Sequence, residues 1–450
     1  MSRSLQSAGL ALLGLCAACL GTGSLRAEEA PLLLREAFPA GYQYHVSCRV
    51  ELSGNLSLPA EKAGTPPRAL TVTGNSAIEY DERVLSAGKD GQVDKTMRIY
   101  RRIDFQRKVG DRPQESTIRP GVRRLVVLRH ENAEVPFSPD GPLTWGEIDL
   151  VRTDVFTPAL TGLLSDKAVA IGDRWKATRG SIQELTDMER IEEGEVECRF
   201  DQVTTLSNRR HARISFSGTV RGINEDGPNR QQLEGHFFFD LESQHLSYLS
   251  LQGVSSLLDK DGKVLGAVEG RFVLTRQAHN RVAELSDAGL RGVNTEPDAE
   301  NTLLLYENAE LGIRFLHPRR WHVAGVRGQQ VALDEANGNG VLVTVEPPER
   351  VPKAAQFLAE SRDWLEKQKA KIVRVEEPRS LRVNSQELEH FAIDTEIAGQ
   401  KVLMDYYVSR QAAGGATLAA RLLPADAAAL SKEIERIARS LQVAKKASGP

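Results

Sequence analysis

The sequence is poor in cysteine and lacks any apolar run long enough to cross a membrane. Its 450 residues include four cysteines, two of them within the first 20 residues, and the zinc-hydrolase spacing His-Glu-x-x-His does not occur. No segment approaches the roughly 20 apolar residues that a membrane-spanning helix needs. The sequence therefore predicts no membrane span and no common zinc-protease chemistry.

Only two cysteines, Cys48 and Cys198, follow the first 27 residues. A Cys-x-x-Cys metal or redox motif is thus excluded from that part of the chain. In an oxidising compartment the two thiols allow one intramolecular disulfide, and the alternative is a pair of inert cysteines.

The first 27 residues have the layout of a secretory signal peptide. Arg3 precedes an apolar run over residues 9–20, and small and polar residues follow it. A basic start, a short apolar run and a small-residue end are typical of such leaders. We therefore expect an exported protein, either periplasmic or extracellular. Lipoprotein anchoring through Cys16 or Cys19 is the lesser alternative, because no convincing Leu-small-small triplet precedes either residue.

The chain that follows this leader is mildly acidic but contains one basic stretch. Removing Arg3 and Arg26 leaves 56 basic against 61 acidic residues, a net charge of −5, which argues against nucleic acid as a partner. Residues 98–129 hold ten basic and only three acidic residues. This excess predicts either a surface for an anionic partner, such as lipid headgroups or an acidic glycan, or ordinary solvated strand faces. The residues assigned to a partner surface are Arg98, Arg101, Arg102, Arg123 and Arg124, with Arg319 and Arg320 from the C-terminal part.

Two histidine pairs are the nearest approach to a metal site. His317 and His322 are five residues apart across a proline, which directs their rings apart. His236 and His245 flank a predicted turn but have no third ligand nearby in the sequence. We therefore predict no catalytic residue, no metal site and no cofactor.

The chain is long enough for two domains. Residues 281–301 are polar, contain Gly and Pro and lack an apolar period, which predicts a linker. We therefore expect a signal peptide over 1–27, a first domain over 28–280 and a second over 302–445.

The first domain is predicted to be rich in strands. Apolar and polar residues alternate over 211–221, and similar segments follow at 230–241, 244–258 and 263–277, separated by short turns. This pattern predicts an antiparallel meander. A second strand-rich block precedes it over 42–130, so we expect a curved sheet or a partly open barrel.

Between these blocks, residues 163–175 read LLSDKAVAIGDRW. The segment resembles one that recurs in uncharacterised exported bacterial β-rich domains, and it names no reaction. We expect Trp175 to pack in the core at a sheet edge, and a ligand-stacking role is the alternative.

The second domain alternates strands and helices. A strand is predicted over 311–317, a helix after Pro352, three more strands, and a final helix after Pro424. The first helix is expected to bury the apolar positions Phe357, Leu358, Ser361, Trp364, Leu365, Gln368 and Ile372, which recur at three- and four-residue steps.

The opening of this domain, YENAELGIRFLHPRRW, resembles the start of the PsbP-like α/β sandwich family. The matching positions are Tyr306, Asn308, Leu311, Gly312, Phe315, Pro318 and Trp321. Members of that family share binding and assembly functions, so the resemblance implies a partner-docking domain and transfers no active-site residue.

These observations predict an α+β protein. A curved antiparallel β-rich domain would precede a PsbP-like α/β/α sandwich with a central antiparallel sheet. The function we expect is non-enzymatic binding or assembly, with an unknown protein or envelope component as the partner of the C-terminal domain. The alternatives are an exported hydrolase with a site in the β-rich domain and a carrier of lipid or another ligand.

Overall fold

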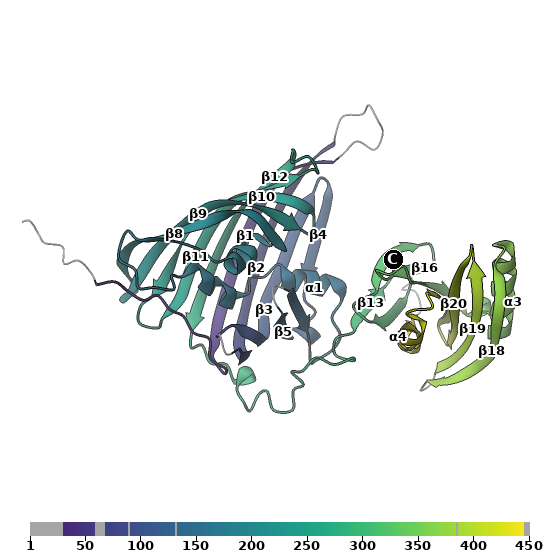
Figure 1. Ribbon diagram of the computed structural model, residues 1–450. Coiled ribbons are helices and arrows are strands. Elements are labelled where there is room, and N and C mark those ends of the chain that lie inside the picture. The colour runs from purple at the N-terminus through teal and green to yellow at the C-terminus, as the bar shows by residue number, and fades with distance from the viewer. Residues whose placement is uncertain (1–29, 59–67, 89–90, 131–132, 384–385, 445–450) are drawn as a thin grey trace, which may run out of the picture.

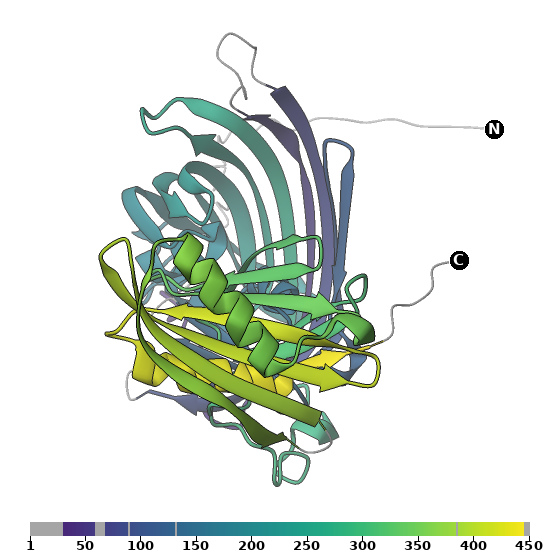
Figure 2. The ribbon, with the colours of Figure 1, turned by 90° about the vertical axis from the view of Figure 1, so that its right-hand side faces the viewer.

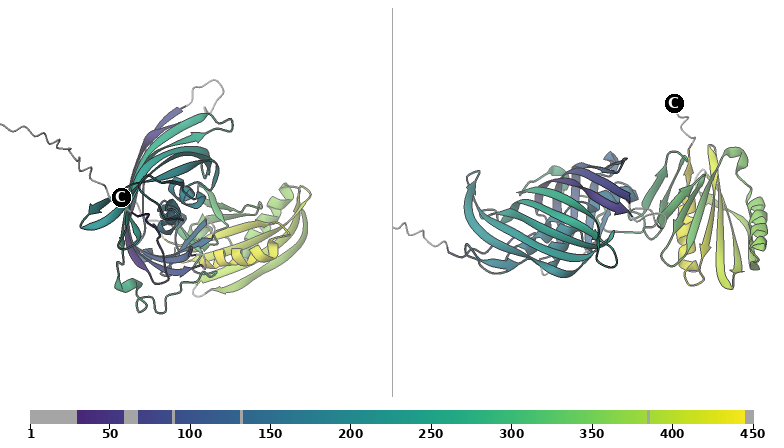
Figure 3. Two further views of the ribbon diagram at one scale, coloured as in Figure 1. Left: turned by 60° about the vertical axis from the view of Figure 1, so that its left-hand side comes forward. Right: turned by 90° about the horizontal axis from the view of Figure 1, so that it is seen from above.

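The computed structural model describes residues 30–58, 68–88, 91–130, 133–383 and 386–444. Two separate β-sheet bodies lie side by side, with the larger formed by the N-terminal part (Figures 1 and 3). Among the described residues, no helix combines the length and apolar character that crossing a membrane requires.

The N-terminal sheet has 12 antiparallel strands in the order β6-β5-β3-β2-β1-β12-β11-β10-β9-β8-β7, with β4 beside β3. Because β6 and β7 are the two ends of this order, the sheet is open. The meander predicted over 211–277 is confirmed, since β9 to β12 follow one another as antiparallel neighbours. The strands are β1 (Gln43–Leu58), β2 (Arg68–Ala87), β3 (Val93–Val109), β4 (Arg112–Thr117), β5 (Arg124–His130), β6 (Ala133–Phe137), β7 (Arg174–Lys176), β8 (Arg190–Leu206), β9 (Arg209–Asn224), β10 (Gly227–Asp240), β11 (His245–Leu258) and β12 (Val264–Ala278).

A row of glycines accompanies the strong curvature of this sheet. Six residues stand in direct register across six neighbouring strands, in the order Gly74, Leu52, Gly270, Gly253, Leu233 and Gly218. A Cβ atom at Gly218 would lie 2.1 Å from the Glu195 carbonyl oxygen, and one at Gly253 would lie 2.7 Å from that of Gln232. Only residues without a side chain permit such close approach, and glycine at such positions lets strands bend.

Short helices fill part of the concave face. They are α1 (Trp145–Arg152), η2 (Thr157–Leu163) and α2 (Arg179–Thr186), and the strands curl around them (Figure 2). The side chains of Ile148, Leu160 and Ile182 join strand residues in one continuous apolar core. Trp175 of β7 packs against this core and donates a hydrogen bond from Nε1 to the Leu163 oxygen at 2.9 Å. Two shorter 3₁₀ turns complete this region, η1 (Pro120–Val122) and η3 (Ala283–Leu285).

The segment after β12 packs on the opposite, convex face. Leu285 is fully buried against Met97 and Ile99 of β3. The Leu285 oxygen accepts hydrogen bonds from the side chains of Arg83 at 2.6 Å and Gln43 at 3.2 Å. The first half of the segment expected to be a linker is therefore held against the sheet, whereas residues 294–301 are mostly exposed.

The C-terminal region has a seven-stranded antiparallel sheet in the order β15-β16-β17-β21-β20-β19-β18 and a three-stranded sheet β13-β14-β22. Helix α3 packs on one face of the larger sheet through Leu358 and Leu365, and α4 packs through Leu430 and Ile434 in a separate core with Trp321. The elements are β13 (Leu304–Asn308), β14 (Ile313–His317), β15 (His322–Arg327), β16 (Gln330–Asp334), β17 (Gly340–Glu346), η4 (Pro348–Arg350), α3 (Ala354–Lys367), β18 (Lys371–Val383), β19 (Gln386–Ile397), β20 (Gln400–Gln411), β21 (Gly414–Leu422), α4 (Ala427–Ser440) and β22 (Gln442–Val443).

Three sequence expectations are wrong. The described residues are β-rich rather than α+β, because strands hold 56% of them and helices 15%. Four strands, not three, separate α3 from α4: Ile372 lies in the additional edge strand β18 instead of ending the helix, and the edge position tolerates Pro378. Trp364 is 49% exposed although its helical spacing predicted burial. The buried face of α3 is narrower than the apolar pattern, with Leu358, Ser361 and Leu365 directed inward.

Candidate ligand-binding face

An apolar strip lies on the concave face, beyond the part that the helices cover. It comprises Val50, Leu52 and Leu56 of β1, Leu70 and Val72 of β2, Phe105 of β3, and Val268 and Phe272 of β12. All are half-buried except Val72, which is buried. The alternate residues on β1 and β2, such as Ser53 and Thr73, are exposed and polar on the other face. The strip thus has the alternation of a core-facing surface, yet among the described residues only Phe105 and Phe272 pack against the main core.

The glycine row crosses this strip. Leu52 has Gly74 and Gly270 as its direct cross-strand neighbours, and Gly253 follows on β11. No side chains project from these glycines, and the Leu52 side chain lies over both of them. A Cβ atom at Gly74 would lie 3.6 Å from one Leu52 methyl group, and a Cβ atom at Gly270 would lie 3.3 Å from the other. An extended apolar molecule along the row would therefore contact the leucine side chains together with the glycine backbone.

Two arginines stand at the edge of the strip, Arg107 in register with the glycine row and Arg112 on β4, which pairs with Val109. Arg107 of β3 is exposed and pairs across the strands with Gly74 on β2 and Gln114 on β4. It lies two residues from Phe105 on the same strand, and alternation places both side chains on the concave face. Leu52, Gly74 and Arg107 also help to line a pocket of about 310 Å³ where β1 to β4 meet.

The strip ends at a buried polar network under the helices. The Arg98 guanidinium donates hydrogen bonds from Nε to Glu82 at 2.8 Å and from Nη1 to Asp154 at 3.1 Å. Tyr44 donates to Glu82 at 2.5 Å, and Tyr100 donates to Asp154 at 3.2 Å. The side chains of Arg98, Glu82 and Asp154 are fully buried. The loop after α1 is thereby attached to β1, β2 and β3.

Burial controls the electrostatics of this network. It raises the pKa of Asp154 to about 7, because desolvation outweighs the attraction of Arg98, whose charge also serves Glu82. A neighbouring pair of bonds links Arg129 of β5 to Glu134 and to Glu184 of α2, at 3.4 and 2.7 Å. Burial likewise raises the pKa of Glu134 to about 7. The attachment of the helices to the sheet is thus sensitive to pH near neutrality.

The basic stretch does not form one continuous surface. Arg98 was assigned to a partner surface, and that assignment is wrong because its side chain is fully buried in the network just described. Arg101 bonds to Asp81 at 2.8 Å and Arg102 to Asp104 at 2.5 Å, while Arg124 pairs with Asp140. Arg123 is exposed. Nearby carboxylates therefore neutralise most of the excess positive charge counted over residues 98–129.

The C-terminal arginines also separate. Arg319 lies between the two bodies, where it donates hydrogen bonds to the backbone oxygens of Pro136 and of Thr302, the latter at 3.0 Å. Burial lowers its pKa to about 10. Arg320 is half exposed and pairs loosely with Glu433 at 3.7 Å. Both arginines were expected on a partner surface, and only Arg320 is exposed enough to contact a partner.

Both cysteines are buried and free. Cys48 lies on β1 and Cys198 on β8, which are five steps apart in the sheet order. At about 4.8 Å per strand, such a separation far exceeds the Cα distance of under about 7 Å that a disulfide allows. Burial raises the pKa of both thiols, which makes them poor nucleophiles.

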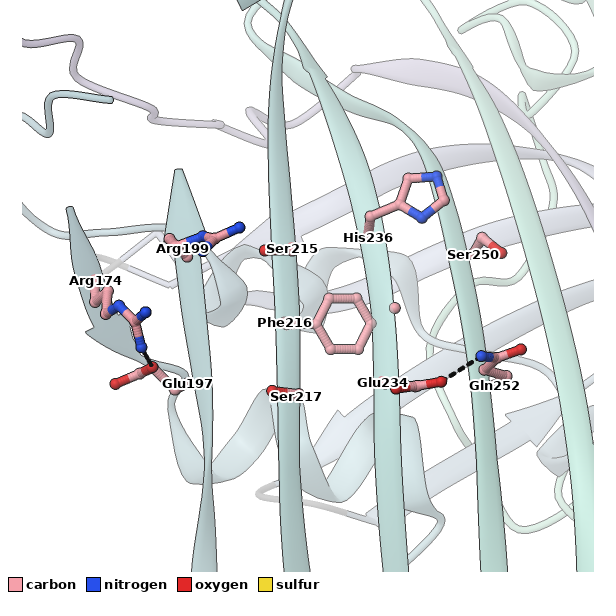
Figure 4. A pocket seen from close by; sticks show the side chains of 11 residues that line it. Arg174, Glu197, Arg199, Ser215, Phe216, Ser217, Glu234, His236, Ser250 and Gln252 are labelled. Carbon is pink, nitrogen blue, oxygen red and sulfur yellow. Dashed lines mark hydrogen bonds and ion pairs between the residues drawn. The ribbon is translucent and has the colours of Figure 1, made fainter. Parts of the chain in front are cut away.

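A second pocket, of about 520 Å³, lies on the convex face over β7 to β11 (Figure 4). His236 is the central titratable group, and burial lowers its pKa. Its ring packs beside Phe238 and Tyr248, with centroids 5.5 and 5.8 Å away. The nearby Ser215 hydroxyl donates to Asp201 at 3.0 Å rather than to the histidine. The described residues therefore form no nucleophile–base pair here.

The histidine pairs do not form metal sites in the described part of the chain, where no group of three or more ligand residues occurs. His236 pairs across the strands with Ser250, whereas His245 pairs with Asp240. His317 is buried with Nδ1 3.1 Å from the Pro318 oxygen, and His322 is exposed with its ring 5.4 Å from that of Trp145.

Sequence reasoning missed the apolar strip and Arg107. The residues of this region indicate a strand within the block over 42–130, but not which face of it stays uncovered. Predicting an uncovered face required the register of β1 with β2 and β12, because register decides which apolar residues gather. Arg107 was counted among the basic residues without its position at the edge of an apolar surface.

Comparisons with known proteins give fold likenesses for parts of the chain. No family model matches the sequence, and no curated protein is similar to it. Cyanobacterial PsbP from Synechocystis sp. PCC 6803 is 12% identical and covers 32% of this chain and 92% of its own, with a TM-score of 0.25. Lipovitellin is 8% identical and covers 64% of this chain and 29% of its own, with a TM-score of 0.33. A Pseudomonas aeruginosa protein of unknown function is 11% identical, covering 30% and 91%, with a TM-score of 0.19.

The likeness to PsbP that the sequence predicted is thus present over about a third of the chain, and no family membership is shown. The expected resemblance of the N-terminal region to exported β-rich domains stays a prediction. With scores this low, function has to be argued from the residues of the chain itself.

Proposed function

We propose that this is an exported, non-enzymatic binding protein whose N-terminal sheet holds an apolar chain against its concave face. The apolar strip carries the proposal. Its eight side chains are arranged as a core surface would be, but the described helices cover only the neighbouring part of the face. Half-exposed apolar residues gathered on one face favour a binding role.

The energetics support a carrier more than an enzyme. Each square ångström of apolar surface removed from water stabilises a complex by roughly 25 cal/mol before the costs of association. A chain lying over Leu52 and Val268 would remove strip and ligand surface from water together. In the convex pocket, by contrast, Ser215 bonds to Asp201 and the His236 ring packs against Tyr248.

Binding of the neutral apolar fluorophore N-phenyl-1-naphthylamine tests the proposal. The chain without its leader should give a saturable increase in fluorescence. Leu52→Glu should weaken this binding at least tenfold, because a charge would enter the strip. Ser53→Glu is the matched control, since the adjacent side chain is exposed on the convex face. No saturable signal in the parent protein, or equal affinities for the two variants, would contradict the proposal.

The C-terminal domain is proposed as the module that docks a partner protein or envelope component. Trp364 of α3 is 49% exposed and Val373 of β18 is 64% exposed. The bulge between Ile372 and Arg374 accounts for Val373, because it leaves that residue out of the pairing with β19. Large apolar side chains presented in this way are common anchors of protein interfaces.

A further inference from the structure

We infer that the ligand of the concave face is a single-chain amphiphile with an anionic headgroup, and that Arg107 binds that headgroup. This inference rests on the proposed function and specifies its ligand class. It starts from the charge distribution over the strip. On the strands that carry the strip, the concave positions from Val50 to Leu56, Leu70 to Ser76 and Val268 to Phe272 hold apolar residues, glycine or serine.

Arg107 is the exception in this surface. In direct register with Gly74, Leu52 and Gly270, it is the cation that ends the row. Its two cross-strand neighbours, Gly74 and Gln114, carry no charge. Within the described part of the chain, Arg107 has no carboxylate within ion-pair distance, unlike Arg101, Arg102 and Arg124 on and beside the same strand.

A second polar group supports the headgroup position. Ser76 of β2 pairs with Phe105 of β3, one concave-facing position from the Gly74–Arg107 pair. Its hydroxyl is buried, and among the described residues it has no hydrogen-bond partner. Buried hydroxyl groups usually have a partner, and this unpartnered one lies next to the position proposed for the headgroup.

The dimensions of the surface suit one acyl chain. From β3 to β12 there are three strand spacings, or about 14 Å, comparable to an extended chain of about ten to twelve carbons. The guanidinium can form two parallel hydrogen bonds with a carboxylate or phosphate. A hydrogen bond to a charged group contributes more to binding than one between neutral groups.

Competition between two ligands with the same chain tests this inference. Decanoate and 1-decanol are each used to displace N-phenyl-1-naphthylamine from the chain without its leader. We expect decanoate to bind about tenfold more tightly than the alcohol, as expected for a hydrogen bond to a charged group. The preference should shrink as salt is added.

Variants at Arg107 supply the decisive comparison. Arg107→Gln should remove the preference for decanoate while leaving the affinity for 1-decanol unchanged, which also shows that the variant is folded. Arg107→Glu should reverse the preference in favour of decyltrimethylammonium. Lys108→Gln is the matched control, because the next residue is exposed on the convex face, and it should retain the preference.

The outcomes separate the inference from the proposed function. Equal binding of decanoate and 1-decanol by the parent protein would overturn the anionic ligand and leave the apolar site standing. A preference that survives Arg107→Gln would overturn the role of this arginine. Displacement by neither ligand, with no binding of the fluorophore, would overturn the proposed function as well.

Discussion

At the scale of single residues, the most unusual feature is a charged network buried under the inner helices, where the apolar strip ends. Arg98 serves two carboxylates, Glu82 and Asp154, and its Nη2 atom has no hydrogen-bond partner among the described residues. Burying such groups is costly, and removal of one partner leaves another charge uncompensated. The network is thus poor evidence for stability and better evidence for a defined position of the inner helices.

The raised pKa of Asp154 predicts a pH dependence with a definite sign. Between about pH 4 and the folded-state pKa of about 7, the folded protein keeps a proton that the unfolded chain releases. The contribution of this carboxyl group to the free energy of unfolding is therefore favourable at low pH. It is lost as the pH rises from about 4 to about 7, by an amount on the order of 4 kcal/mol.

Urea unfolding between pH 4 and pH 7 tests whether the pKa of Asp154 is raised in the folded protein. Asp154→Asn stays neutral, so the free energy of unfolding of the parent minus that of the variant should decline from pH 4 to pH 7. Parallel pH profiles for the parent and Asp154→Asn would show that the carboxyl titrates normally.

The burial of Arg98 could not be predicted from alternation. Its neighbours Met97 and Ile99 point to the convex face, where the segment after β12 covers them, and Tyr100 points to the concave face with Arg98. Both faces of β3 are buried here, so the polar and apolar sides that define a half-buried strand are not distinguishable. Because Leu285, far away in the sequence, buries the convex side of β3, the alternation does not show that Arg98 lies on the concave side.

At the scale of elements, local pattern predicted most strands and both C-terminal helices. The alternation over 211–277 identified β9 to β12, because short turns fix antiparallel neighbours. The pattern failed at β18, where Pro378 and charged residues conceal an edge strand. It also failed on α3, where apolar spacing did not distinguish the buried Leu365 from the exposed Trp364.

Two tryptophans of the C-terminal domain should behave in opposite ways. Trp321 is fully buried and donates a hydrogen bond from Nε1 to Glu433 at 2.9 Å, so Trp321→Ala should lower the free energy of unfolding by roughly 3 to 5 kcal/mol. Trp364→Ala should change it by less than about 0.5 kcal/mol. Denaturant unfolding of residues 28–450 measures both effects.

The same pair tests the docking role. If α3 anchors a partner, the Trp364→Ala protein should lose a partner that the parent captures from the exported fraction. Equal stabilities for the two variants would contradict the packing of Trp321, and undiminished capture by Trp364→Ala would contradict the docking surface.

At the scale of the whole molecule, the feature that the sequence does not predict is the register between strands. The sequence indicates a curved sheet, but the row from Gly74 to Gly218 exists only because six strands align in one register. Those glycines are far apart in the chain, and each alone resembles an ordinary turn or bulge glycine. The expected α+β class was wrong because helix patterns do not show how much of the chain each element occupies. The strands of the N-terminal sheet are mostly longer than the helices, so strands dominate.

The concave face as a binding surface is the central claim, and covalent mapping of a bound chain tests it most directly. A dodecanoate analogue with a diazirine at the end of its chain is photoactivated with the chain without its leader, and the adducts are located by peptide mass spectrometry. We expect adducts within residues 50–56, 70–72 and 268–272, reduced by excess unlabelled dodecanoate. Adducts confined to the convex pocket or the C-terminal domain, or none above background, would contradict it.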